Sequence, residues 1–202
     1  DAVRRKLSPN TGTAIDEIGS VLPGIMTPQL LKPIPQSYWN LSGAMWAYVF
    51  GNAAVMGIDA VHVSELIDYP AQVASTTLLD WNNGEPNARY WVAKLLRDNF
   101  GPGDEIVQPL PPNDEFHGPD PLIQIYAQGF ISPQGTRKLL LVNKRSRPID
   151  IVVPGIDGGT QQIVDRTTNA SPRIHPIRSN TVHLPELAVA VLILPSSRVQ
   201  SH

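Results

Sequence analysis

Two adjacent carboxylates, Asp16 and Glu17, are the residues whose type and position best suit catalysis. They stand near the end of residues 13–19, a short run of strand type that Gly19 closes and a proline-rich loop follows. A carboxylate can act as a nucleophile or as a general acid or base. The end of a strand in a repeated strand–helix fold is where such groups are placed. Because side chains alternate along a strand, only one of the two can face a common site, and a solvated acidic pair is the alternative interpretation.

The segments after this pair alternate between helix and strand patterns. Residues 40–56 have a helical pattern that Asn40 would cap and that Gly57 ends, since glycine tolerates the left-handed C-cap conformation. Its expected apolar face contains Leu41, Met45, Val49 and Val55 or Met56.

A second strand and a second helix follow. Residues 60–66 are typical of a strand, and residues 88–100 of an amphipathic helix with Pro86 in its first turn. The apolar face of this second helix contains Trp91, Leu95 and Leu96, and Trp91 and Trp46 are expected in the core. The order strand, helix, strand, helix predicts a βα-repeat with parallel strands.

The second half of the sequence has the pattern of an antiparallel β-domain. A proline-rich connector over residues 101–121 precedes short strand-like runs at 122–130, 137–143, 148–153, 161–165, 181–184 and 187–194. Short strands at this spacing indicate a sandwich or barrel. The last run has no polar alternation, which predicts a place in the centre of the sandwich. We therefore expect two domains, residues 1–104 with the βα-units and residues 105–202 with the β-sandwich.

Three sequence stretches carry a family resemblance. Residues 13–20 (TAIDEIGS), 42–47 (SGAMWA) and 56–61 (MGIDAV) resemble the seventh strand, seventh helix and eighth strand of retaining glycoside hydrolases with a (β/α)₈ barrel. The similar enzymes are of the heparanase, β-glucuronidase and β-xylosidase type, in clan A, and their barrel leads into a C-terminal β-sandwich. The resemblance implies the last two βα-units of a barrel followed by the sandwich, and it implies that Glu17 is the nucleophile.

The same resemblance suggests which side chains contact a sugar. Glu65 and His62 lie at the end of the expected eighth strand, where a polar strand terminus is the alternative interpretation. Trp81 follows that strand on a loop, where its ring could stack on a sugar or pack as part of the core or a lid. Tyr38 and Trp39, at the entry to the first helix, have the same two alternatives.

A retaining glycosidase needs a second carboxylate, about 5–5.5 Å from the first, as its acid/base. In the similar enzymes this Glu ends the fourth strand after an Asn, and no Asn-Glu pair occurs in this sequence. A (β/α)₈ barrel alone takes about 250 residues, so 202 residues cannot hold both barrel and sandwich. We expect the chain to need an N-terminal barrel portion or self-association, with a carbohydrate as its substrate.

Composition and missing motifs exclude other classes of function. A net charge of −2 argues against binding nucleic acid by phosphate neutralisation, and no apolar stretch is long enough to predict a membrane span. The five His have no metal-ligand spacing, and no nucleotide-binding motif or nucleophile elbow is present. We expect no metal and no cofactor. We also expect an extracellular, secreted location, although the absence of Cys does not decide the compartment.

Two classes of function remain open. The first is a retaining glycosidase, or its nucleophile-bearing part. The second is a non-catalytic carbohydrate-binding or structural β-sandwich module, or an inactive truncated hydrolase, and the missing acid/base Glu favours it. The order strand, Glu, loop, helix, strand, helix, sandwich is the more specific feature, and it favours the hydrolase.

Overall fold

The computed structural model describes residues 2–20, 22, 34–67, 74–80, 83–107, 124–168 and 171–195. Its first half contains the helix α1 (Ala2–Leu7), the strand β1 (Ala14–Ile18), the helix α2 (Gln36–Met56), the strand β2 (Ala60–Val63), the 3₁₀ turn η2 (Ala74–Thr76) and the helix α3 (Ala88–Asn99). The remaining elements are strands: β3 (Glu105–Val107), β4 (Ile125–Ile131), β5 (Arg137–Asn143), β6 (Ile149–Val152), β7 (Thr160–Val164), β8 (Arg173–Pro176), β9 (Thr181–Leu184) and β10 (Val189–Ile193).

The strands β1 and β2 form a parallel pair joined through α2, which confirms the predicted βα-repeat. Gly57 ends α2 in the left-handed conformation, with φ 67°, as the sequence predicts. Its backbone N–H donates to Ala53 and Ala54, so two carbonyls of the last helical turn have a partner.

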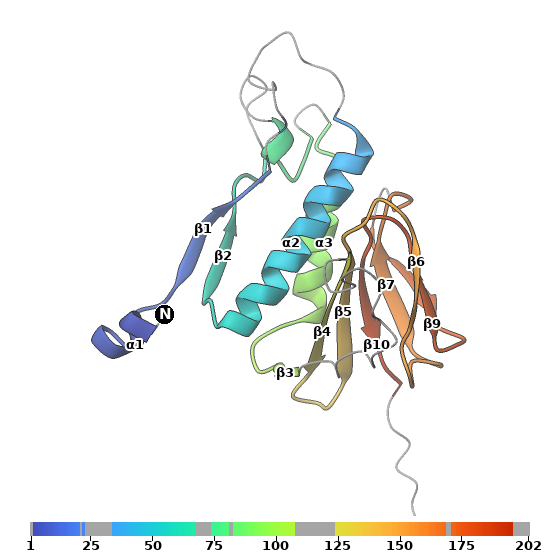
Figure 1. Cartoon of the computed structure of the whole chain (residues 1–202). Helices are drawn as coiled ribbons and strands as arrows, with labels where there is room; N and C mark the ends of the chain where they lie inside the picture. The colour runs from blue at the N-terminus through green and yellow to red at the C-terminus, as the bar shows by residue number, and fades with distance from the viewer. Residues whose placement is uncertain are drawn as a thin grey trace, which may run out of the picture.

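The other strands form two antiparallel sheets. A six-stranded sheet has the order β3-β4-β5-β10-β7-β8, and β6 pairs with β9. Figure 1 shows α2 and α3 between the β1–β2 pair and the six-stranded sheet, with β6 and β9 on the far side of that sheet. The fold is thus a βα-repeat placed against an antiparallel β-structure, with one face of the large sheet covered by helices.

Both faces of the strand β10 are buried, which explains the unbroken apolar run at residues 187–194. Val189 and Val191 belong to the cluster that packs against α2 and α3, whereas Ala190 and Leu192 belong to the cluster under β6 and β9. The predicted central position of this strand is confirmed, because β10 pairs with both β5 and β7. The helix-side cluster joins residues from both halves of the chain, and the boundary at residue 104 stays a prediction.

The prediction for α2 is wrong in its start and in its buried face. The helix begins at Gln36 with Pro35 as the N-cap residue, so Asn40 lies inside it, buried at 2% exposure. Leu41 and Val55, expected in the core, are about half exposed. The buried residues are mostly small: Ser42, Gly43, Ala44, Ala47, Gly51 and Ala53, together with Tyr38, Asn40 and Trp46. Small side chains bring the helix backbone close to α3 and the sheet, and this packing decides which face is buried.

Other boundaries also differ from the predictions. The second strand ends at Val63 instead of residue 66, and Asn87, not Pro86, begins α3 by accepting from the N–H of Arg89. Two short edge strands, β3 and β8, were not predicted, and β3 lies within the expected connector. All four residues of β8 are exposed, including Ile174, and a strand of four residues is too short for a sequence pattern to reveal it.

Candidate active site

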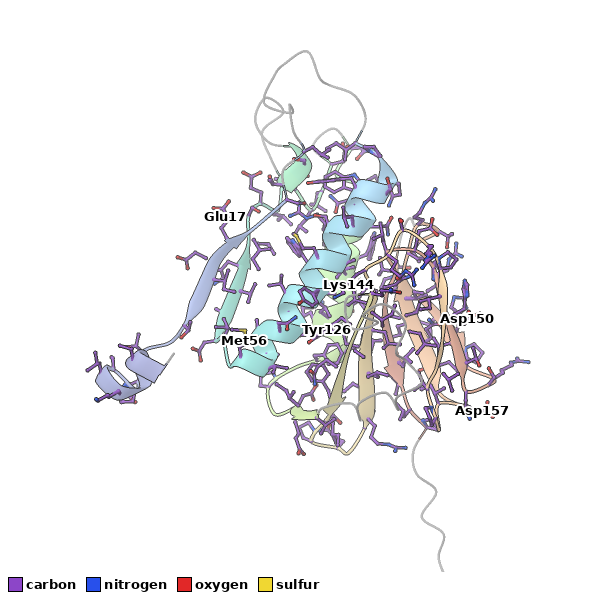
Figure 2. All side chains as sticks on the ribbon, in the orientation of Figure 1. Glu17, Met56, Tyr126, Lys144, Asp150 and Asp157 are labelled. Carbon is purple, nitrogen blue, oxygen red and sulfur yellow. The ribbon has the colours of Figure 1, made fainter. Side chains whose placement is uncertain are left out.

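Glu17 lies near the C-terminal end of β1 and is exposed to solvent, as is its neighbour Asp16. Figure 2 shows the Glu17 side chain on the side of the strand away from α2. The pairing shifts at this point, because Ile15 lies opposite Val61 and Ile18 opposite Val63, so three steps on β1 match two on β2. A bulge of this kind re-aims side chains and is common beside active sites. The fold therefore presents Glu17 as an accessible carboxylate at a strand end.

A close approach of backbones continues the pairing beyond Glu17. The hydroxyl of Ser64 donates to the carbonyl of Ile18 over 2.8 Å, and the Ser64 N–H donates to the same oxygen over 3.3 Å. A Cβ at Gly19 would collide with the Ser64 hydroxyl oxygen and lie 3.6 Å from Cγ2 of Thr76. Only glycine fits at this position without moving a neighbour, so Gly19 lets the segment after β2 lie directly against the end of β1.

Glu65 is the residue after Ser64 in the chain. Its carboxylate is half-buried and accepts a hydrogen bond of 2.8 Å from the Thr76 hydroxyl, so its orientation is fixed by η2. His62 lies on β2 and is exposed. Glu65 is thus adjacent to Ser64, the residue bonded to the end of β1. His62 lies between Val61 and Val63, opposite the bulge at Asp16 and Glu17.

Of the two aromatic residues at the start of α2, Tyr38 is buried and Trp39 is partly buried. The Tyr38 hydroxyl lies within hydrogen-bond distance of two carbonyl oxygens, that of Ser75 at 2.8 Å and that of Ser20, between which its single proton is shared, so it ties the segments after β1 and β2 together. Trp39 packs edge-on against Tyr38, with ring centroids 5.2 Å apart, and contacts the helix-side core. Trp81 lies outside the described residues. A sugar-binding role for these three stays a prediction, while the expected core positions of Trp46 and Trp91 are confirmed.

Arg89 is the residue near the site that the sequence did not reveal. It lies in the first turn of α3 with no exposed surface, and its Nη1 donates to the carbonyl of Ser75 over 2.9 Å. Its guanidinium carbon lies 4.6 Å from the centre of the Trp46 ring. Burial lowers the pKa of Arg89, opposed by the electrostatic influence of Tyr38 and Glu65. An arginine in an amphipathic helix usually faces solvent, so its type and spacing carry no signal of this burial.

Two further observations concern the part of the chain that the structure describes. No group of three or more His, Asp or Glu residues there could hold a metal ion. Among the helices of those same residues, none is long and apolar enough to cross a membrane.

The folded chain is similar to solved structures of carbohydrate-degrading enzymes. A glycoside hydrolase family 30 subfamily 8 xylanase from Clostridium acetobutylicum matches with a TM-score of 0.62 and 11% identity, over 97% of this chain and 45% of the xylanase. A GH51 arabinofuranosidase from Xanthomonas axonopodis pv. citri matches with a TM-score of 0.60 and 15% identity, over 96% and 43%. A conserved exported protein from Bacteroides fragilis matches with a TM-score of 0.63 and 12% identity, over 93% and 40%.

These likenesses define the fold and not the activity, because the identities are low. The chain spans less than half the length of these three structures. No protein-family model and no curated protein sequence matches the chain. The chain has a fold found in glycoside hydrolases, in agreement with the resemblance noted from its sequence at that level; a relation to the heparanase type in particular stays a prediction.

Proposed function

We propose that this chain is the nucleophile-bearing part of a retaining glycoside hydrolase, with β1 and β2 as two neighbouring strands of a (β/α)₈ barrel and the antiparallel sheets as its C-terminal β-sandwich. The observation that carries the proposal is the exposed Glu17 carboxylate at the end of a bulged parallel strand. The fold around it is shared with xylan- and arabinofuranoside-degrading enzymes, judged by the names of those neighbours.

In this proposal Glu17 attacks the anomeric carbon of the sugar. A bond forms between the carboxylate oxygen and that carbon, and the bond to the leaving oxygen breaks with its electron pair. A second carboxylic acid protonates the leaving oxygen, and as a carboxylate it later takes a proton from the water that releases the sugar. We assign this acid/base to a barrel portion outside these 202 residues, because the sequence has no Asn-Glu pair.

Glu65 is the second acid that we place at the sugar. Held by the Thr76 hydroxyl, its carboxylate can accept hydrogen bonds from sugar hydroxyls. We propose Glu65 and His62 as sugar-binding residues, with Trp81 as a stacking platform. Tyr38 and Trp39 complete this set, and they act from beneath the site by shaping the loop segments that they contact.

The β1–β2 pair needs a partner in this proposal. It is a two-stranded sheet, a size that is marginal by itself in water, and no third strand joins it among the described residues. Large apolar side chains are exposed on α2 and on the segment that begins with β2: Leu41, Val55, Met56, Val63, Leu66 and Ile67. We propose that further barrel strands, from another segment of polypeptide or a second copy of the chain, cover these edges. Light scattering that shows a stable monomer with intact thermal unfolding would contradict this part.

We also propose that the protein acts outside the cell. Its polymeric substrate would be found there, and a similar structure is described as a conserved exported protein. Mass spectrometry of the mature protein in the culture medium and in the cell pellet decides this point, and recovery from the pellet alone would contradict it.

The function is tested with substrates that need no general acid. The 2,4-dinitrophenyl β-glycosides of xylose, glucose and glucuronic acid have a leaving group that departs without protonation. The chain is assayed alone and in the assembly that light scattering reveals, beside Glu17→Gln and, as the matched control, Asp16→Asn. We expect hydrolysis of at least one glycoside that Glu17→Gln lowers about 10³-fold or more and Asp16→Asn lowers less than tenfold.

Either of two results contradicts the proposal. Hydrolysis that survives Glu17→Gln removes the nucleophile assignment. Binding of oligosaccharides without hydrolysis of any of the three glycosides would favour the non-catalytic carbohydrate-binding module instead.

A further inference from the structure

Arg89 is the largest side chain without exposed surface, and its bonding is incomplete. Its Nη1 donates to the carbonyl of Ser75 over 2.9 Å and makes a long contact of 3.5 Å to that of Thr77. Nε and Nη2 have no hydrogen-bond partner in the described structure. A buried charge with unpaired donors costs stability, so packing alone does not explain this arrangement.

The two carbonyls that Arg89 contacts do not depend on it for a partner. The Ser75 carbonyl also accepts from the Tyr38 hydroxyl over 2.8 Å, and the Thr77 carbonyl also accepts from Nδ2 of Asn87 over 2.8 Å. Removal of the guanidinium would leave each carbonyl with one other hydrogen-bond partner, but the turn would lose its contacts with Arg89. It would also remove a desolvated cation and the two nitrogens that lack a partner.

What Arg89 touches is the turn that holds Glu65. Ser75 and Thr77 flank Thr76, all three are buried, and the Thr76 hydroxyl is the donor to the Glu65 carboxylate. The electrostatic interaction with Glu65 also favours the charged form of Arg89 and raises its pKa, against the larger lowering by burial. The contacts thus run from α3 through η2 to an acid beside the end of β1.

We propose that Arg89 is a positioning residue for the sugar site: its guanidinium fixes the 75–77 backbone so that Thr76 holds Glu65 as an oriented acceptor for a sugar hydroxyl. The proposal rests on the proposed function for its sugar-binding part. In this arrangement the unpaired nitrogens of Arg89 lower the stability of the fold, while its contacts orient Glu65; functional sites commonly break packing rules in this way. A structural arginine and a positioning arginine therefore predict opposite effects of an apolar replacement.

The first arm of the test needs no activity. Thermal unfolding and amide hydrogen exchange are measured for the full chain, for Arg89→Met, and for Arg97→Met, an exposed arginine of the same helix, as the matched control. We expect Arg89→Met to unfold at the wild-type temperature or above. It should speed exchange at the amides of Ser64, Leu78 and Leu79, which donate to Ile18 and Leu66. Arg97→Met should change neither.

The second arm uses hydrolysis of 2,4-dinitrophenyl β-xyloside, or of the glucoside or glucuronide if that is the better substrate. Loss of one hydrogen bond to a charged group predicts that Arg89→Met and Glu65→Gln each raise KM about tenfold, with a smaller change in kcat. If Arg89 acts through Glu65, the double variant should be no worse than Glu65→Gln alone. Arg89→Lys, which keeps the charge and one donor, should recover part of the loss.

The outcomes separate this proposal from the proposed function. A marked fall in unfolding temperature for Arg89→Met, or unchanged exchange at the three amides, overturns the positioning role whether or not hydrolysis occurs. Additive effects of Arg89→Met and Glu65→Gln on KM overturn it as well. If the first arm gives the expected result and no glycoside is hydrolysed by wild type, only the proposed function fails.

Discussion

Gly51 is a point where α2 lies directly against Tyr126 of β4, and Gly51→Ala tests whether this contact positions the helix. A Cβ at Gly51 would lie 2.5 Å from Cε1 and 2.7 Å from Cζ of Tyr126, and closer still to the hydroxyl oxygen. The ring cannot easily retreat, because it packs edge-on against Tyr48 with centroids 5.2 Å apart and contacts the helix-side core.

The expected cost follows from two opposing terms. Alanine gains about 1 kcal/mol over glycine in a helix interior, and overpacking a well-packed core costs about 1–3 kcal/mol. With two ring carbons inside 3 Å the upper end applies, so we expect Gly51→Ala to lose about 2 kcal/mol of unfolding free energy. Since about 1 kcal/mol shifts the unfolding temperature by about 2–4 °C in a chain of this size, the midpoint should fall by about 4–8 °C.

Chemical denaturation and thermal unfolding measure this change. Gly101→Ala is the control, because no atom lies within 4 Å of its Cβ and the change should stay within about 0.5 kcal/mol. In a Tyr126→Leu background, where the ring is absent, the cost of Gly51→Ala should shrink. A Gly51→Ala variant as stable as wild type would refute the argument that the α2 backbone must approach the sheet through glycine.

Three further predictions concern the core and the site. Burial raises the pKa of Tyr126 to about 12, above the value near 10 of an unfolded chain, so the unfolding free energy should fall as pH rises from 10 toward 12. Between pH 8 and pH 11, wild type should lose about 1 kcal/mol more unfolding free energy than Tyr126→Phe in chemical denaturation, and equal losses would contradict this. Asp104→Ala leaves the buried Lys138 ammonium without its carboxylate at 2.8 Å and should lower the unfolding free energy by about 3 kcal/mol in chemical denaturation. The double variant Asp104→Leu with Lys138→Met should recover most of this loss, and equal stability of the single and double variants would argue against a buried pair. Gly19→Ala should displace Ser64 and so lower kcat/KM for the best dinitrophenyl glycoside about tenfold, with a smaller fall in unfolding temperature than Gly51→Ala. Unchanged kinetics would show that catalysis does not need the close approach at Gly19.

The sequence predicted the elements with strong patterns. The run at residues 187–194 lacks polar residues because its strand is buried on both faces, and this pattern predicts the central position of β10 from the sequence alone. Gly57 ended α2 through its backbone freedom, a local property that needs no tertiary information. The parallel pairing of β1 and β2 followed from the helix between them.

Features that depend on tertiary packing were missed. α2 is apolar on most sides, so periodicity could not tell that Gly43 and Gly51 face the core while Leu41 is half exposed. The edge strand β8 is only four residues long and exposed throughout, so no buried face marks it in the sequence. At the candidate site, Glu17 is predicted from its type and position, and its role stays a prediction. The Thr76 contact of Glu65 and the burial of Arg89 arise from tertiary contacts around η2 and the start of α3.

The central claim is that Glu17 is the nucleophile, and identification of the residue that a trapped sugar modifies tests it most directly. The protein is incubated with the 2-deoxy-2-fluoro-β-glycosyl fluorides of xylose, glucose and glucuronic acid, digested, and its peptides are sequenced by mass spectrometry. We expect one sugar equivalent in ester linkage to Glu17, absent from Glu17→Gln and retained in Asp16→Asn. A label on Asp16, on Glu65 or on no residue at all would contradict the claim.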